Sequence, residues 1–286
     1  MSPSTAPPTA PPSGSTSSTR NVRALVLGIL NVTPDSFSDG GRFLDPDRAI
    51  EHAETMLGEG ADMIDIGGES TRPGAEPVDV ATELGRVIPV VERLSSRCRV
   101  AIDTRRPEVA RAAVTAGASL INDTTAELWP VAAELGVGWI AMHMQGSPAT
   151  MQQRPTYTDV VAEVRDFLVE RAGQARAAGV EEVWIDPGFG FGKTLDHNLE
   201  LLANLDALVS TGWPVAVGTS RKSMLGQLLA RSDGADQHVP ADDRLVGSVA
   251  TATYAMLQGA GLVRVHDVKA ARQAAMVVAG EAAGER

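Results

Sequence analysis

The stretch Val100–Asp123, VAIDTRRPEVARAAVTAGASLIND, predicts two short strands with a helix between them. We expect strands at Val100–Ile102 and Ser119–Ile121, because short runs of apolar and β-branched residues bounded by polar ones are typical of buried strands. The helix is expected to begin at Pro107, which suits a first helical position, and to stop at Gly117, a residue typical just beyond a helix C-terminus. Strand, helix and strand in this order indicate a parallel βαβ unit.

The same alternation continues along the whole chain. Further helices are expected from Asp45-Pro46 onward and between Thr158 and Gly179, where apolar residues recur on one helical face. Eight strands alternating with helices predict an α/β fold, the (β/α)8 TIM barrel of parallel strands with outer helices. A doubly wound open sheet is the alternative. The other six strands are expected at Ala24–Leu30, Met63–Ile66, Gly138–Met142, Val183–Ile185, Pro214–Val217 and Leu262–Val265.

Composition restricts the class of protein. Residues 1–20 are almost entirely Ser, Thr, Pro, Ala and Gly, and we expect this arm to be disordered because it has little apolar surface to bury. Residues 21–286 have the length of a single barrel domain. The net charge of −11 argues against nucleic-acid binding, and no apolar run is long enough for a membrane helix. The single cysteine, Cys98, cannot form an internal disulfide, so we expect a cytoplasmic protein.

Polar residues end most of the expected strands. Alternation along the eighth strand places the cationic pair Arg264 and His266 on one face, and Val263 and Val265 on the other. Any one polar end could be a helix cap, but buried polar groups without partners cost a few kcal/mol each, so their convergence predicts a ligand site. Active sites of these barrels lie at the C-terminal face. The earlier strands end on Asn31, Asp103, Asn122 and Asp186.

The segment Gly218–Ser223, after the seventh strand, is typical of an anion site. A glycine-containing loop that opens a helix presents backbone N–H groups to an anion, and Arg221 and Lys222 add positive charge. Phosphate sites of these barrels lie after strands seven and eight. A solvated surface pair is the alternative interpretation of Arg221 and Lys222.

A second glycine-rich segment, Asp186–Thr194 with the sequence DPGFGFGKT, ends like a nucleotide-binding P-loop. Pro187 occupies the position of that motif's first glycine, so we reject nucleotide binding. A glycine-rich loop flanked by Phe189 and Phe191 is better suited to a flat ring packed against an aromatic edge.

The motifs and their order resemble those of the dihydropteroate synthases. The resemblance covers about residues 25–278 and implies a transferase of folate biosynthesis. Such an enzyme joins 6-hydroxymethyl-7,8-dihydropterin diphosphate to p-aminobenzoate and releases pyrophosphate. It implies these two small molecules as partners, Mg²⁺ as the cofactor, and a homodimer. The matching segments are Leu27–Gly41, Asp65–Gly74, Ile102–Thr104, Ile121–Asp123, Asp186–Lys193, Ser220–Ser223 and Arg264–Asp267.

The resemblance also implies roles for the matched residues. The diphosphate is expected to contact Asn31, Arg264 and His266, and Asn31 is also the expected Mg²⁺ ligand. Catalysis is expected to depend on Lys222, Arg264, His266 and Asp186. The p-aminobenzoate pocket is expected to contain Phe37, Thr71, Pro73 and Ser223, with Arg72 in the loop beside it. The pterin is expected to contact Asp103, Asn122, Met142, Asp186, Phe191, Gly218 and Lys222.

One segment departs from the family pattern. Members of the family usually continue Ile121–Asp123 with Val-Ser-Gly, whereas this chain has Thr124-Thr125-Ala126, and losing the glycine is expected to alter how the backbone approaches the pterin. Two alternatives share the fold: a pterin-binding methyltransferase domain, which does not need the diphosphate cations, and a non-catalytic synthase paralogue, which should have lost site residues. The presence of Lys222, Arg264 and His266 together favours the synthase.

Overall fold

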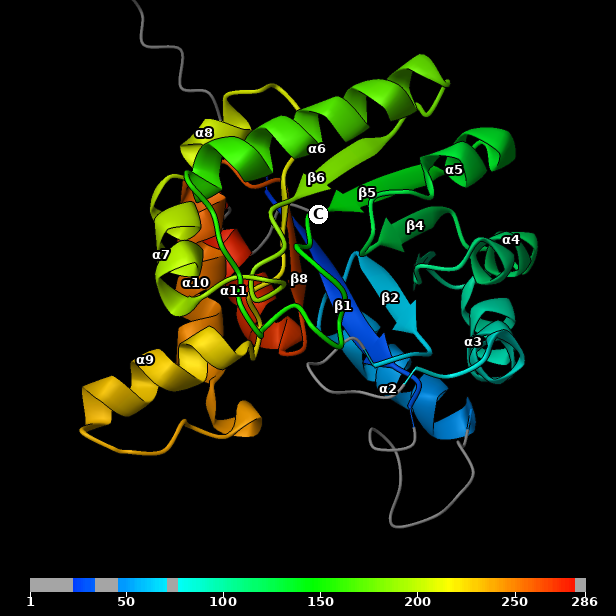
Figure 1. Ribbon diagram of the computed structural model, residues 1–286. Coiled ribbons are helices and arrows are strands. Elements are labelled where there is room, and N and C mark those ends of the chain that lie inside the picture. The colour runs from blue at the N-terminus through cyan, green and yellow to red at the C-terminus, as the bar shows by residue number, and fades with distance from the viewer. Residues whose placement is uncertain (1–22, 34–45, 71–76, 281–286) are drawn as a thin grey trace, which may run out of the picture.

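The computed structural model describes residues 23–33, 46–70 and 77–280, and it shows eight parallel strands surrounded by helices (Figure 1). The strands are hydrogen-bonded in the order β6-β5-β4-β3-β2-β1-β8-β7, and a parallel bridge between Ile185 and Val215 joins the two ends of the sheet. This confirms the predicted TIM barrel, because a doubly wound sheet would keep two open edges. The strands are β1 (Leu25–Asn31), β2 (Met63–Gly67), β3 (Arg99–Asp103), β4 (Leu120–Asp123), β5 (Gly138–Met142), β6 (Val183–Asp186), β7 (Ala216–Val217) and β8 (Leu262–Val265).

The helices begin and end close to the positions that the sequence predicts. Helix α4 begins at Pro107, and Gly117 beyond its end has a φ of 113°. Helix α6 begins after Asp159, whose side chain accepts a hydrogen bond from the backbone N–H of Ala162. The helices are α2 (Pro46–Gly58), α3 (Val80–Leu94), α4 (Pro107–Thr115), α5 (Trp129–Leu135), α6 (Val160–Ala177), α7 (Leu195–Ala203), α8 (Asp206–Val209), α9 (Ser223–Asp233), α10 (Leu245–Leu257) and α11 (Val268–Ala279), with a 3-10 turn at Ala241–Asp243.

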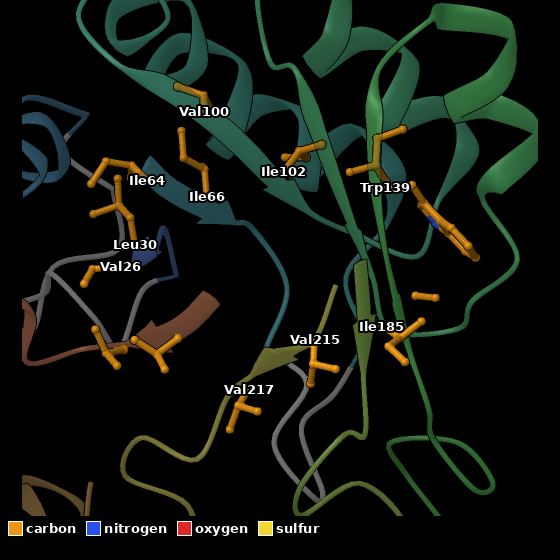
Figure 2. Close-up of a cluster of buried hydrophobic side chains, with 14 of the residues drawn as sticks. Val26, Leu30, Ile64, Ile66, Val100, Ile102, Trp139, Ile185, Val215 and Val217 are labelled. Carbon is orange, nitrogen blue, oxygen red and sulfur yellow. The ribbon is translucent and has the colours of Figure 1, made fainter. Parts of the chain in front are cut away.

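Alternating side chains divide the core into two layers. The outer layer fills the space between strands and helices, and Figure 2 shows part of it, including Val26, Ile64 and Ile102. The inner layer fills the barrel and consists of Ala, Leu, Ile and Met side chains. Burial of each Val, Leu, Ile or Met side chain contributes about 1.5–3 kcal/mol, so both layers stabilise the barrel. The inner residues are Leu27, Met63, Ala101, Leu120, Ile140, Ala216 and Leu262.

The alternation also decides which side chains can reach a ligand. In β8, Leu262 belongs to the inner layer, whereas Val263 and Val265 belong to the outer layer, as predicted. Arg264 therefore points into the barrel mouth.

Two predictions concern features of the chain as a whole. The disordered arm predicted for residues 1–20 lies outside the described residues, so it stays a prediction. None of the helices in the described ranges is both long and apolar enough to cross a membrane.

Candidate active site

A pocket of about 310 Å³ lies at the C-terminal ends of the strands. Parallel strands bring their C-terminal ends to one face of the barrel, so residues far apart in the sequence meet there. All of the residues predicted to contact a pterin line this pocket, together with Arg264. The lining residues are Asp103, Asn122, Thr124, Met142, Asp186, Gly188, Phe189, Phe191, Gly218, Lys222 and Arg264.

Arg264 is held by two carboxylates at the base of the pocket. Its Nε lies 2.5 Å from Asp65 Oδ2, and its Nη2 lies 2.6 Å from Asp103 Oδ2. Burial alone would lower the pKa of Arg264, but Asp65 and Asp103 raise it above its ordinary value. The guanidinium therefore remains a fixed positive charge beside the pocket.

Asp65 is a residue that the sequence analysis missed. Its side chain is fully buried, and Oδ2 also accepts a hydrogen bond from Asn122 Nδ2 at 2.9 Å. The signal was present in the sequence, because Asp65 interrupts an apolar strand and shares its inward face with Met63. Asp65 thus positions two pocket residues, Arg264 and Asn122, through one oxygen atom.

The two pocket carboxylates have raised pKa values for related reasons. Burial raises the pKa of Asp103 to about 7, because the attraction of Arg264 only partly offsets burial and the like charge of Asp65 adds to it. Burial also raises the pKa of Asp186, although the backbone N–H of Gly188 donates to its Oδ1 at 2.7 Å. Asp103 can therefore gain or lose a proton near neutral pH, and burial favours the neutral form of Asp186 as well.

The loop after β6 brings an aromatic ring beneath a cation. Lys222 Nζ lies 3.9 Å from the centroid of the Phe191 ring, a distance at which cation–π attraction is favourable. The loop packs so closely that a β-carbon on Gly188, whose φ is 67°, would lie 1.9 Å from the carbonyl oxygen of His143. Only glycine fits this position.

Lys193 explains why the P-loop resemblance of this loop is misleading. Its buried Nζ lies 2.9 Å from His143 Nδ1 and donates at 3.1 Å to the carbonyl oxygens of both Gly188 and Phe191. Burial lowers the pKa of Lys193 to about 7 and that of His143 to about 3. The ammonium group is therefore engaged by its own loop, and it holds the Phe191 segment against the end of β5.

The structure corrects two predictions about the anion site. Arg221 does not line the pocket; its guanidinium pairs with Asp267 and Asp242. Burial and the nearby Arg264 and Arg221 lower the pKa of His266 to about 3, so its imidazole is neutral rather than cationic in the free protein. His266 Nδ1 lies 3.0 Å from the Ser220 hydroxyl, and a neutral ring with this partner can still donate a hydrogen bond through Nε2.

Asn31, the predicted metal ligand, lies beside the Arg264 cluster, which consists of Arg264, Asp65 and Asp103. A β-carbon added to Gly67 would lie 3.8 Å from Asn31 Oδ1 and 3.7 Å from Asp103 Oδ2, so oxygen atoms line this glycine cradle. Among the described residues, no three His, Cys, Asp or Glu side chains are grouped as metal ligands. An oxygen-lined cradle without a complete protein cage fits Mg²⁺, which commonly binds through substrate phosphates and one or two protein ligands.

Most of the residues predicted to contact p-aminobenzoate lie outside the described ranges. Phe37, Thr71, Arg72 and Pro73 lie outside the described residues. Ser223 is exposed at the first position of α9, next to Lys222.

The segment that departs from the family pattern is held by one carboxylate. Asp123 accepts hydrogen bonds from the backbone N–H groups of Thr125, Glu127 and Leu128 and from the indole of Trp139. Ala126 has a φ of 55°, a left-handed conformation that favours glycine. The chain therefore retains the loop conformation that suits the missing glycine, with strain at Ala126.

Known proteins resemble this chain over most of its length. A family model described as pterin binding enzyme matches residues 27–266. The chain is 49% identical over 261 residues to the dihydropteroate synthase of Escherichia coli K12, covering 88% of this chain and 90% of that protein. It is 48% identical over 262 residues to that of Mycobacterium leprae, with 88% and 92% covered.

Two solved structures have the same fold. Dihydropteroate synthase from Yersinia pestis, solved with a sulfonamide drug, has a TM-score of 0.82 and 46% identity, and 90% of this chain and 94% of that chain are covered. The enzyme from Xanthomonas albilineans, in complex with 7,8-dihydropteroate, has a TM-score of 0.78 and 45% identity, with 89% and 92% covered.

Proposed function

The chain belongs to the pterin-binding enzyme family and is a dihydropteroate synthase by its similarity over most of its length, and from this premise we propose which residues perform the reaction. The enzyme condenses 6-hydroxymethyl-7,8-dihydropterin diphosphate with p-aminobenzoate, giving 7,8-dihydropteroate and pyrophosphate. The observation that carries the proposal is the pocket that joins Asp103, Asn122 and Asp186 to Lys222 and Arg264.

We propose that the pterin ring lies deep in this pocket. Carboxylates accept hydrogen bonds from ring N–H and amino groups, which suits Asp103 and Asp186, and the Lys222 ammonium suits the ring carbonyl. Asn122 is held by Asp65 and offers its carbonyl oxygen to the same ring edge. Met142 and Phe191, which cluster with Met151, provide an apolar surface for the ring face.

The diphosphate is proposed to lie toward Arg264, His266 and Asn31. Arg264 supplies a fixed charge for the anion, and neutral His266 donates a hydrogen bond to it. Asn31 Oδ1 would hold Mg²⁺ together with the substrate phosphates, and the bound ion would neutralise part of the charge of the leaving group. The p-aminobenzoate pocket is proposed to include Ser223, with Phe37, Thr71 and Pro73 as the remaining predicted contacts.

In the proposed mechanism, the carbon–oxygen bond between the pterin methylene and the diphosphate breaks, and the arylamine nitrogen bonds to the same methylene carbon. The electron pair of that carbon–oxygen bond leaves with the diphosphate, and the arylamine nitrogen passes one proton to solvent water. Arg264 is preorganised by Asp65 and Asp103, so it can stabilise the growing charge without reorganising. The electron-rich dihydropterin can stabilise a methylene cation, which favours a dissociative path, and no covalent nucleophile is required.

We propose that the enzyme acts as a homodimer in the cytoplasm. Helix α10 exposes Val246 by 72% and Leu257 by 64%, and α11 exposes Val277 by 80%, so these neighbouring helices present apolar side chains to solvent. A second copy of the chain would bury them. Cys98 is a free thiol, which agrees with a reducing compartment. Sedimentation analysis of the full chain tests the dimer, and Leu257→Asp should shift it toward monomer; a wild-type monomer would contradict it.

The reaction is tested by pyrophosphate release with both substrates and Mg²⁺. Release that requires both substrates, and inhibition by a sulfonamide that competes with p-aminobenzoate, are the expected results. A well-folded protein that releases no pyrophosphate would favour the non-catalytic paralogue. Tight pterin binding without any dependence on a diphosphate would favour the methyltransferase alternative.

A further inference from the structure

Arg221 has an unusual backbone conformation in the loop that connects β7 to α9. Its φ is 58°, and Arg221 and Ala126 are the two non-glycine residues with positive φ in the described ranges. A residue with a β-carbon is disfavoured in the left-handed region, so it persists there only where its surroundings impose it. Lys222, which follows Arg221, lines the pterin pocket, and Ser220, which precedes it, contacts His266.

Side chains from the start of α10 hold both backbone groups of Arg221. Its N–H donates to Ser248 Oγ at 3.0 Å, and its carbonyl oxygen accepts from Arg244 Nη1 at 2.8 Å. The Arg244 guanidinium passes close to Gly226 of α9, where a β-carbon would lie 2.6 Å from Arg244 Nε. The left-handed turn is therefore built into the packing of α9 against α10 (Figure 1).

The side chain of Arg221 ties the same turn to the loop after β8. Its Nη2 lies 2.7 Å from Asp267 Oδ1 and its Nε lies 3.2 Å from Asp267 Oδ2, while Nη1 lies 2.8 Å from Asp242 Oδ1. The Asp267 contact is a paired, partly buried interaction, whereas the Asp242 side chain is 89% exposed. Charged pairs with this fork geometry fix orientation as well as adding energy. We therefore expect the ion pair with Asp267, rather than the contact with Asp242, to stabilise the turn at Arg221.

The neighbours of this ion pair are linked in the same way. Ser220 precedes Arg221 and His266 precedes Asp267, and the Ser220 hydroxyl accepts a hydrogen bond from the His266 backbone N–H at 3.1 Å and lies 3.0 Å from His266 Nδ1. On the other side of Arg221, Lys222 lies over the Phe191 ring. One turn therefore sets the placement of two proposed ligand-binding groups, Lys222 and His266.

We propose that Arg221 is a positioning residue: its ion pair with Asp267 stabilises a left-handed turn that aims Lys222 into the pterin pocket and holds Ser220 against His266. The inference rests on the proposed pterin and diphosphate placement, but it concerns a side chain that does not line the pterin pocket and pairs with Asp267 and Asp242 instead. It differs from the interpretation of Arg221 as a direct anion contact, in which the charge itself would be needed at the substrate.

Glycine and alanine at position 221 separate these interpretations. Both Arg221→Gly and Arg221→Ala remove the charge and the ion pair, but glycine adopts the left-handed turn without penalty and alanine does not. We expect Arg221→Ala to raise KM for the pterin diphosphate about tenfold and to weaken binding of inorganic pyrophosphate. Arg221→Gly should stay within about threefold of the wild type, and Asp267→Asn should weaken binding in the wild-type background more than in Arg221→Gly.

A matched control separates the effect of left-handed backbone strain on stability from the effect of misplaced side chains on substrate binding. Gly136 ends α5 with a φ of 65° and has open space around it, so Gly136→Ala adds the same kind of strain far from the pocket. It should lower the melting temperature as Arg221→Ala does while leaving KM unchanged. Equal damage in Arg221→Gly and Arg221→Ala would overturn the proposal in favour of a direct charge contact, and wild-type KM in both would show that Arg221 positions nothing. If wild-type protein releases no pyrophosphate, the proposed function fails instead, and pyrophosphate binding by the two variants still tests the turn.

Discussion

Replacing Asp65 with asparagine should shift the pH dependence of pterin binding. Asp65 Oδ2 takes both hydrogen bonds, from Arg264 and Asn122, and Oδ1 is buried without a hydrogen-bond partner among the described residues. An asparagine oxygen can keep both hydrogen bonds while its amino group takes the place of Oδ1. The substitution therefore removes mainly the negative charge.

The size of the expected pKa shift follows from the repulsion between the Asp65 and Asp103 carboxylates. Asp65 and Asp103 contact the same guanidinium, at 2.5 and 2.6 Å. Two like charges ~5 Å apart repel each other by ~3 kcal/mol at an effective dielectric constant of ~20, and solvent in the pocket reduces this energy. Because one pKa unit corresponds to about 1.4 kcal/mol, we expect the pKa of Asp103 to fall by at least about one. The neutral acceptor should also weaken two charge-assisted hydrogen bonds, which costs about 2 kcal/mol of folding free energy.

The assay is kcat/KM for the pterin diphosphate between pH 5 and 9. In the wild type the pKa of Asp103 is about 7, and the ionised carboxylate is the form that accepts a ring N–H, so kcat/KM should rise through that pH. In Asp65→Asn the rise should be centred near pH 6 or below, with a lower plateau. Substrate phosphates titrate equally in both proteins, so the quantity to compare is the difference between the midpoints of the two pH profiles.

Asp62→Asn is the matched control for this experiment. Asp62 precedes β2 at the opposite end of the barrel, where it pairs with Arg23 at 2.8 Å, and its loss should lower stability without moving the pH profile. The reasoning would be refuted if Asp65→Asn kept the wild-type midpoint while remaining folded.

Three further substitutions test other parts of the site. Ala126→Gly should stabilise the fold by up to about 1 kcal/mol, because relief of the left-handed strain exceeds the added freedom of the unfolded chain. Urea unfolding measures the change in the free energy of unfolding, and clear destabilisation would contradict the prediction. Lys193→Met should cost about 3 kcal/mol by leaving buried acceptors unpaired. The pKa of Lys193 is about 7 when folded and 10.5 ordinarily, so the unfolded chain binds more protons between these values and wild-type stability should rise with pH there. Melting temperatures across that range should show the rise weakened in Lys193→Met, and an identical slope would count against it. Asp186→Asn should raise KM for the pterin diphosphate at least tenfold with KM for p-aminobenzoate unchanged, and unaltered pterin affinity would remove Asp186 from the pterin site.

The fold and the inward-facing residues were predictable from the sequence for a simple reason. Strand alternation is a local property of the sequence. It places Val263 and Val265 on the face that packs against the helices and Arg264 on the face that points into the barrel. Strand β7 came out shorter than Pro214–Val217, because Val215 makes only an isolated bridge to Ile185. Such an end depends on a partner strand that the local pattern does not contain.

The partners of charged residues were less predictable. Arg221 and Lys222 are adjacent in the sequence, yet one pairs with Asp267 and the other lies over Phe191. The direction of each side chain depends on the left-handed turn at Arg221, which arises from packing against α10. The neutral state of His266 likewise depends on burial and on Arg264, neither of which a motif reports.

The Arg264 cluster joins the two halves of the proposed site. Asp103 pairs with Arg264 in the free protein, and it is also a proposed acceptor for the pterin ring. A ring N–H that engages Asp103 would draw part of its charge away from the guanidinium, leaving Arg264 more strongly positive toward the diphosphate. Asp65 would keep the guanidinium in place during this change, because its carboxylate is fully buried and does not line the pterin pocket. The pterin half of the substrate would therefore strengthen the cation that stabilises its own leaving group, an effect that Asp65→Asn and Asp186→Asn should change in different ways.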